Sequence, residues 1–471
     1  MPHTVETDLC VIGAGSGGLS VAAGAAQMGA RVVLIEKEKM GGDCLNTGCV
    51  PSKSLLAAAR AAQEARTSGR FGVASHEPRI DARAVHAHVH GVIAEIAPHD
   101  SVERFEGLGV RVIREAARFT GPREVAAGEA RIRARRFVVA TGSSAAVPPI
   151  PGLDRTPFLT NETVFEAIER PDRLVVIGGG PIGLELAQAH RRLGAAVTVL
   201  DAGSILPRDD PEAVEVVRRR LLAEGVALHE GAEVRSVARR DGGVAVTVGG
   251  EGRGHTVAGS HLLVATGRRA NVDGLGLDAA GIEHSARGIT VDARLRTTNK
   301  RVFAVGDVAG GRFTHEAGYH AGIVLRNALF RWPARADAAM PWVTYTDPEL
   351  AHVGLRADEA EARGGASVAR FAFAENDRAR AERETEGFAK VVVGRRGRVL
   401  GATVVGRGAG ELILPWVLAV GQGLGIGAMA GVVAPYPTLG EVSKRAAGAY
   451  YTPKLFGAGT RRVVRLLQRL G

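Results

Sequence analysis

The amino-acid sequence predicts an α/β protein with two Rossmann-like dinucleotide-binding domains, and two glycine-rich segments carry most of this prediction. Residues 8–36 read as a strand, a glycine turn, a helix of small residues and a second strand that ends on an acid. Residues 173–201 repeat this order. Strands and helices that alternate in this way are typical of a parallel sheet. The length of 471 residues leaves room for two to four domains.

The first glycine-rich segment has the full pattern of a dinucleotide site. Gly13, Gly15 and Gly18 form GxGxxG, which gives a tight turn, a close approach of backbone to a pyrophosphate and close packing of helix on strand. Glu36 follows the second strand, where a carboxylate can accept hydrogen bonds from a ribose. We therefore expect these four residues to bind a cofactor.

The second segment repeats the pattern with Gly178, Gly180, Gly183 and a terminal Asp201. An acid at this position repels the 2′-phosphate of NADP and binds the free 2′-hydroxyl of NAD. Asp201 therefore favours NAD(H). NADP(H) stays open as an alternative, since Arg208 lies in the following loop and its guanidinium could reach a phosphate.

Composition narrows the class of protein. The net charge is +10, yet the basic residues are scattered and aromatic residues make up 4%, so the sequence does not predict a nucleic-acid partner. The N-terminal segment lacks a basic region before its short apolar run, which favours a cytoplasmic protein. Residues 412–437 carry no charge, but the glycines and prolines in them favour two short packed helices over a membrane span.

Two of the three cysteines, Cys44 and Cys49, lie close together in the segment GGDCLNTGCVPSK. A zinc site would need further ligands nearby, and His86 and His90 are better explained as one solvated helix face, so no metal site is predicted. In an ideal helix the two Cα atoms would be roughly 8 to 9 Å apart, beyond the usual span of a disulfide. The helix must therefore begin irregularly, and a strained, easily reduced pair at a helix start favours redox chemistry over a structural role.

Taken together, these motifs resemble the flavoprotein pyridine nucleotide-disulfide oxidoreductases, the group that includes dihydrolipoamide dehydrogenase and mercuric reductase. The resemblance extends to two ATG segments, to TTNKRVFAVGDVAG and to PWVTYTDPELAHVGL. It implies an FAD-binding domain in two parts, an NAD(P)-binding domain and a C-terminal α+β dimerisation domain. The expected boundaries are 1–151 and 272–340 for the FAD domain, 152–271 for the NAD(P) domain and 341–471 for the dimerisation domain.

The resemblance also implies roles for individual residues. Cys44 would be the interchange thiol that faces the substrate, and Cys49 the charge-transfer thiol beside the flavin. Lys53 would lie near flavin N5, paired with Glu185. Further cofactor contacts are implied for Gly142 and Gly267 in the two ATG segments and for Asp307 on the ribityl chain. Such an enzyme would be a cytoplasmic homodimer that passes electrons between a nicotinamide, FAD and a redox-active disulfide bond.

One segment departs from the dehydrogenases and disulfide reductases of this group. They contribute a His-Glu pair across the dimer, whereas here Tyr436 stands at the position of the His and Glu441 at that of the Glu. An unperturbed tyrosine is a poor base at neutral pH. We expect a dihydrolipoamide dehydrogenase-like oxidoreductase that acts on a small or carrier-bound disulfide or dithiol, without membrane contact. The alternative is a mercuric reductase-like enzyme that reduces a metal ion or a quinone with the same flavin.

Overall fold

The computed structural model describes residues 3–240, 242–249, 254–330 and 332–470 of the chain. The chain divides into two units. The first comprises Met1–Ala202 and Gly231–Asp337, and the second comprises Gly203–Glu230 and Ala338–Gly471.

A parallel sheet forms the centre of the first glycine-rich region. Its strands follow the order β3-β2-β1-β6, with β18 paired to the end of β6, and all of these pairs are parallel. The bounds are β1 (His3–Ile12), β2 (Val32–Ile35), β3 (Val110–Ile113), β6 (Ala130–Val139) and β18 (Val302–Ala304). The carboxyl ends of the strands therefore meet at one edge, where doubly wound sheets bind ligands.

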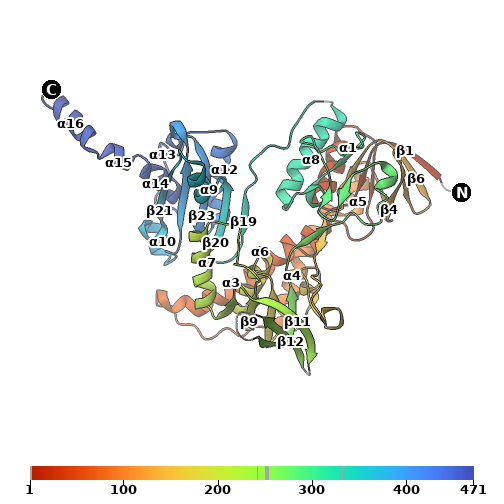
Figure 1. Ribbon diagram of the computed structural model, residues 1–471, viewed down its shortest axis with the longest axis horizontal. Helices are drawn as coiled ribbons and strands as arrows, with labels where there is room; N and C mark the ends of the chain where they lie inside the picture. The colour runs from red at the N-terminus through yellow and green to blue at the C-terminus, as the bar shows by residue number, and fades with distance from the viewer. Residues whose placement is uncertain (1–2, 241, 250–253, 331, 471) are drawn as a thin grey trace. The chain divides into compact units, whose positions relative to one another are not determined.

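Both faces of this sheet are buried, which explains the unbroken apolar run in β1. Leu9 and Val11 pack in the core formed with α1 (Ser16–Gln27) and α8 (Thr314–Leu329), and Figure 1 shows these helices beside β1. Cys10 points to the opposite face and is 0% exposed. That second core includes residues of β4 (Ala117–Gly121) and β5 (Glu124–Ala127), which extend the sheet by antiparallel pairing.

The second glycine-rich segment forms a second parallel sheet in the same unit. Its strands β9 (Ala196–Leu200), β8 (Arg173–Ile177) and β14 (His261–Val264) are parallel neighbours, and α6 (Pro181–Arg192) follows β8. A separate antiparallel sheet consists of β11 (Glu233–Arg240), β12 (Gly243–Gly249) and β13 (His255–Gly259). The predicted pair of strand-turn-helix-strand motifs is thus confirmed.

Three further helices of this unit carry or surround the cysteine segment. They are α2 (Gly42–Asn46), α3 (Cys49–Thr67) and α4 (Ala82–Ile96). Helix α3 packs against both α4 and α6. It thereby joins the cysteine segment to the helix of the second glycine motif.

The second unit contains a five-stranded antiparallel sheet in the order β19-β20-β23-β22-β21. The bounds are β19 (Trp342–Thr344), β20 (Glu349–Gly354), β21 (Ser367–Ala372), β22 (Phe388–Val393) and β23 (Val399–Gly406). Helix α7 (Pro211–Ala223) belongs to this unit as well. Lys390 Nζ of β22 lies 2.9 Å from the carboxylate of Asp210 at the N-terminus of this helix.

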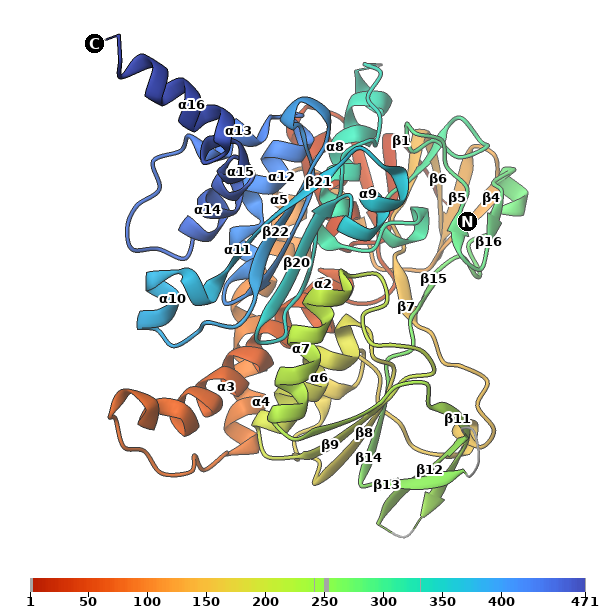
Figure 2. The same cartoon turned by 60° about the vertical axis from the view of Figure 1, so that its left-hand side comes forward.

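Short helices cover this sheet, as Figure 2 shows for α12 (Leu414–Gly421) and α14 (Glu441–Ala449). The apolar stretch 412–437 forms α12 and α13 (Ile426–Ala430), as predicted, and Trp416 of α12 is fully buried. Among the described residues, no helix is both long and apolar enough to cross a membrane. The fold class is therefore as predicted: two parallel α/β sheets and a C-terminal α+β region. The four domain boundaries stay predictions.

Candidate active site

The two cysteines lie on either side of a break between two helices. Helix α2 ends at Asn46 and α3 begins at Cys49, with Gly48 between them in a non-helical conformation (φ −123°, ψ −112°). A Cβ atom at Gly48 would lie 2.9 Å from the backbone oxygen of Asp43, so the turn accepts only glycine without a shift. The irregular helix start that the cysteine spacing requires is thus confirmed.

The thiols of Cys44 and Cys49 hydrogen-bond to each other, and their pKa values move apart. This hydrogen bond lowers the pKa of Cys49 to about 6, with help from the Thr314 hydroxyl 3.5 Å from its Sγ and from the charge of Lys53. The same bond, together with burial and the charge on Cys49, raises the pKa of Cys44. Cys49 is the more exposed of the two side chains. The pair therefore holds one thiolate and one thiol at neutral pH.

A lysine-glutamate ion pair connects the cysteine helix to the second glycine motif. Lys53, one turn after Cys49 on α3, places Nζ 2.8 Å from Oε2 of Glu185 on α6. The Glu185 side chain is 7% exposed, and the Lys53 side chain is 37% exposed. The packing of α3 on α6 thus brings together two residues 132 positions apart, in the pairing that the resemblance implied.

The first glycine turn lies at the carboxyl edge of the first sheet. Gly13 has a φ of +102°, and a Cβ atom on it would meet the backbone oxygen of Ala140 at 2.4 Å, so both the turn and the packing require glycine. At Gly15 a Cβ atom would meet nothing nearer than 3.9 Å. Oε2 of Glu36 accepts a hydrogen bond from the backbone nitrogen of Ala14 (2.6 Å), so the acid lies at the turn.

This first turn fits the diphosphate and ribose of a dinucleotide. Gly15 precedes the first turn of α1, and no side chain among the described residues caps that helix. Its first backbone N–H groups are therefore free to bind an anionic diphosphate.

The second turn has the same construction. Gly178 has a φ of +115°, and a Cβ atom on Gly183 would meet the Gly178 oxygen at 2.0 Å. At Gly180, which precedes α6, a Cβ atom would meet nothing within 4 Å, so the space for a diphosphate is open. Asp201 follows β9 and accepts a hydrogen bond from the Gly179 nitrogen at 2.6 Å. This turn therefore also fits a dinucleotide.

A polar cluster near the first turn includes residues that sequence analysis missed. The half-buried Asp307 accepts a hydrogen bond from the Ser143 hydroxyl, and desolvation raises the pKa of its carboxyl group. Arg268 reaches both acids of the cluster: its guanidinium lies 3.6 Å from Asp307 and 3.1 Å from Asp43. Its position directly after Gly267 in the second ATG segment was the available sequence signal.

The glycines of the two ATG segments lie in loops after parallel strands. Gly142 follows β6 and has a φ of +66°, and Gly267 follows β14 and has a φ of +139°. A Cβ atom at either position would meet nothing within 4 Å. Both loops are therefore open to a ligand at the carboxyl edges of their sheets.

Tyr436 and Glu441 belong to the second unit. The Tyr436 side chain is exposed, and its hydroxyl donates a hydrogen bond to Asp377 (Oη to Oδ2, 3.1 Å). This bond and the charge of Asp377, with a smaller effect of Glu441, hold the pKa of Tyr436 above its usual value. At neutral pH a smaller fraction of this tyrosine is therefore ionised than of an unperturbed tyrosine, so less phenolate is present to act as a base.

Comparisons with known proteins cover nearly the whole chain. The profile of the family described as pyridine nucleotide-disulphide oxidoreductase matches residues 7–340, and that of its dimerisation domain matches residues 340–447. A mercuric reductase of Streptomyces lividans is 37% identical, over 94% of this chain and 96% of the relative. A dihydrolipoyl dehydrogenase of Geobacillus stearothermophilus is 35% identical, with the same coverage.

Solved structures agree with these sequence matches. LpdA of Mycobacterium tuberculosis superimposes with a TM-score of 0.86 at 29% identity, over 94% of this chain and 99% of that protein. The flavoprotein disulfide reductase RclA of Escherichia coli, described as HOCl-induced, has a TM-score of 0.84 at 26% identity and the same coverage.

Proposed function

Because the chain belongs to the pyridine nucleotide-disulphide oxidoreductase family, we propose that it is an FAD-dependent NAD(P)H:disulfide oxidoreductase whose redox-active pair is Cys44 and Cys49. The observation that carries this assignment is the placement of Cys44 and Cys49 on either side of the helix break, with the Lys53–Glu185 ion pair one turn away. The lowered pKa of Cys49 agrees with it. A dithiol that holds one proton is the reduced form that such a disulfide needs for exchange with a substrate.

The residues around the pair would bind and orient the cofactors. The first glycine turn with Glu36 would hold FAD, and Asp307 would bind its ribityl chain. Once bound, FAD supplies the two-electron chemistry between the nicotinamide and the disulfide. Lys53 keeps a positive charge one turn from Cys49, where it favours the thiolate, and Glu185 fixes the position of that charge.

The second glycine turn would bind the nicotinamide dinucleotide. Asp201, held at the turn by the Gly179 nitrogen, favours the 2′-hydroxyl of NAD(H) over the 2′-phosphate of NADP(H). The matched dimerisation domain supports a homodimer, and we propose a cytoplasmic enzyme.

The substrate we propose is a small or carrier-bound disulfide or dithiol, as for a dihydrolipoamide dehydrogenase. The Tyr436–Asp377 hydrogen bond favours a second candidate, a mercuric reductase-like enzyme that reduces a metal ion or a quinone. A tyrosine whose pKa is raised is poorly suited to deprotonate a dithiol, whereas a metal ion needs no such base.

Anaerobic titration of the purified flavoprotein with NADH and NADPH tests the proposal. Two-electron reduction should produce the long-wavelength absorption of a thiolate beside the flavin, with NADH effective at lower concentration. Absence of that band would remove the Cys44–Cys49 mechanism. A panel of dihydrolipoamide, low-molecular-weight disulfides, quinones and mercuric ion would then separate the two candidates.

A further inference from the structure

Two histidines and a glutamate come together between α4 and the turn that follows Thr163 in the first unit. His86 and His90 lie one turn apart on α4, and their ring centroids are 4.2 Å apart. Glu166, at the end of the short 3-10 helix η4 (Val164–Glu166), places Oε2 3.9 Å from His90 Nε2. One ligand atom from each of the three side chains lies within 4.8 Å of the other two.

These distances are close to those in a metal site. Zinc binds imidazole nitrogen and carboxylate oxygen at about 2.0 to 2.2 Å, so ligands around one ion are roughly 3.4 to 4.2 Å apart. His90 Nε2 lies 3.0 Å from the Phe165 carbonyl oxygen, and metal binding through this nitrogen would replace that hydrogen bond. Small side-chain rotations would then bring the three atoms into that range. Both histidines are half-buried and Glu166 is exposed. The imidazole rings are therefore partly covered by protein, and the carboxylate faces solvent.

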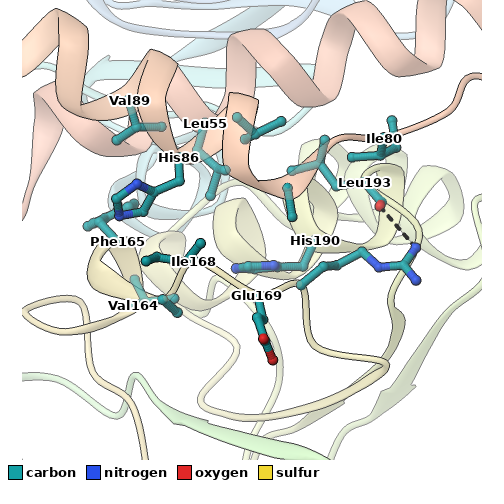
Figure 3. A pocket seen from close by; sticks show the side chains of 14 residues that line it. Leu55, Ile80, His86, Val89, Val164, Phe165, Ile168, Glu169, His190 and Leu193 are labelled. Carbon is teal, nitrogen blue, oxygen red and sulfur yellow. Dashed lines mark hydrogen bonds between the residues drawn. The ribbon is translucent and has the colours of Figure 1, made fainter.

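A cavity beside His86 supplies a second observation, although neither His90 nor Glu166 lines it. It measures about 50 Å³ and is lined by His86 from α4 and His190 from α6, whose rings Figure 3 shows within an otherwise mostly apolar lining. The Nε2 atom of His190 is buried and has no hydrogen-bond partner among the described residues. Burial lowers the pKa of His190 to about 4, so this imidazole is neutral. An unpartnered buried nitrogen indicates that the cavity accommodates a polar ligand.

The local charge favours a cation. The ligand set places the carboxylate of Glu166 beside two imidazole rings, a combination that suits a cation. The nearest guanidinium in the cavity lining, that of Arg170, is engaged elsewhere, with Nη1 3.4 Å from the Leu193 carbonyl oxygen and Nη2 3.8 Å from Asp172.

We propose that His86, His90 and Glu166 bind a first-row divalent transition-metal ion, with zinc as the defining case. Imidazole and carboxylate ligands suit zinc, copper and nickel and discriminate against magnesium and calcium. The ion would fasten η4 to α4, which packs on the helix that carries Cys49. This site is independent of the proposed reaction, because none of its ligands belongs to the redox pair or the glycine turns.

The test is zinc binding to chelator-treated, oxidised holoenzyme, measured by isothermal titration calorimetry. Oxidation withdraws the Cys44 and Cys49 thiols from metal binding. Wild-type enzyme should bind one zinc ion per chain, and His90→Ala and His86→Ala should each weaken binding at least about tenfold. Glu166→Gln should weaken it less.

His88→Ala is the matched control, because His88 lies on the same helix between the two ligands but is exposed and outside the cluster. It should bind zinc as wild type does. Zinc should also raise the melting temperature of wild type and His88→Ala but not of His90→Ala, which separates a binding defect from a folding defect. No zinc binding by wild type at about 100 µM, or equal binding by wild type and His90→Ala, would overturn the proposal.

Discussion

The cysteine segment and the Tyr436 segment differ in how firmly neighbouring residues hold their side chains in place. The Cys44–Cys49 pair sits at a helix break that only glycine accepts, with Thr314 beside Cys49 and an ion pair one turn away. Tyr436 is exposed and makes one hydrogen bond, to Asp377. The groups that we propose carry electrons are thus fixed within one unit, whereas Tyr436, at the position of the family's base, has a single side-chain hydrogen bond in the described part of the chain. We therefore expect electron transfer through the cysteine pair to be efficient already. Proton transfer at the position of Tyr436 should be the step that a substitution can accelerate.

Of the substitutions predicted here, Cys44→Ser should have the largest effect, on electron transfer to a disulfide substrate. Reduction of disulfide substrates should fall by at least about 10³-fold, because the thiol that exchanges with the substrate is lost. Reduction of a quinone with NADH should stay within about twofold of wild type, since that reaction bypasses the pair. Steady-state assays with both acceptors measure this. Equal loss of both activities would mean that Cys44 supports the cofactor site instead.

Gly48→Ala should disturb the geometry of the pair. The added Cβ atom would lie 2.9 Å from the Asp43 backbone oxygen, so the free energy of unfolding should fall by about 1 to 3 kcal/mol. Denaturant unfolding measures the change. Gly69→Ala is the control, because a Cβ atom there would meet nothing within 4 Å. If both variants lose the same stability, the helix break is not as tightly packed as described.

Tyr436→His should accelerate the deprotonation of a dithiol substrate. An imidazole titrates near neutral pH, so dihydrolipoamide:NAD activity should rise about tenfold. Tyr436→Phe removes the hydrogen bond to Asp377 without adding a base, and should give no gain. Measuring kcat for dihydrolipoamide oxidation at neutral pH in wild type and both variants tests this expectation. An unchanged rate in Tyr436→His would indicate that the substrate pocket, rather than the base, limits turnover.

The smallest effect expected is a shift in the titration of Cys49. In the reduced enzyme its alkylation by iodoacetamide should rise with pH around a midpoint of about 6, because the thiolate reacts and its pKa is lowered. Thr314→Val removes one hydrogen bond to Cys49 and should move the midpoint upward by about half a unit. Thr314→Ser should restore it. A midpoint that does not move would assign the lowered pKa to Cys44 and Lys53 alone.

The sequence predicted those features whose signal is local. The two glycine turns, Glu36 and Asp201 could be recognised because turn, helix and acid follow one another at fixed spacing. The helix break at Gly48 followed from the distance that two cysteines can span. The pairing of Lys53 with Glu185 came only from family resemblance, since no local pattern links two helices 132 residues apart.

Other features depend on tertiary packing and left no sequence signal. Thr314 reaches Cys49 from 265 residues away, and Glu166 joins His86 and His90 from a separate turn. The spacing of the two histidines alone predicts a solvated helix face, since Glu166 is distant in the chain. Similarly, the ion pair between Asp210 and Lys390 joins residues 180 positions apart.

The third cysteine gives the native protein an internal standard for chemical labelling. Cys10 is enclosed in the central strand β1, and burial raises its pKa, so a thiol reagent should reach it only after unfolding. A count of reactive thiols on folded enzyme would then report the oxidation state of Cys44 and Cys49 directly. The difference between that count and the count in denaturant would measure the folded fraction of the same sample.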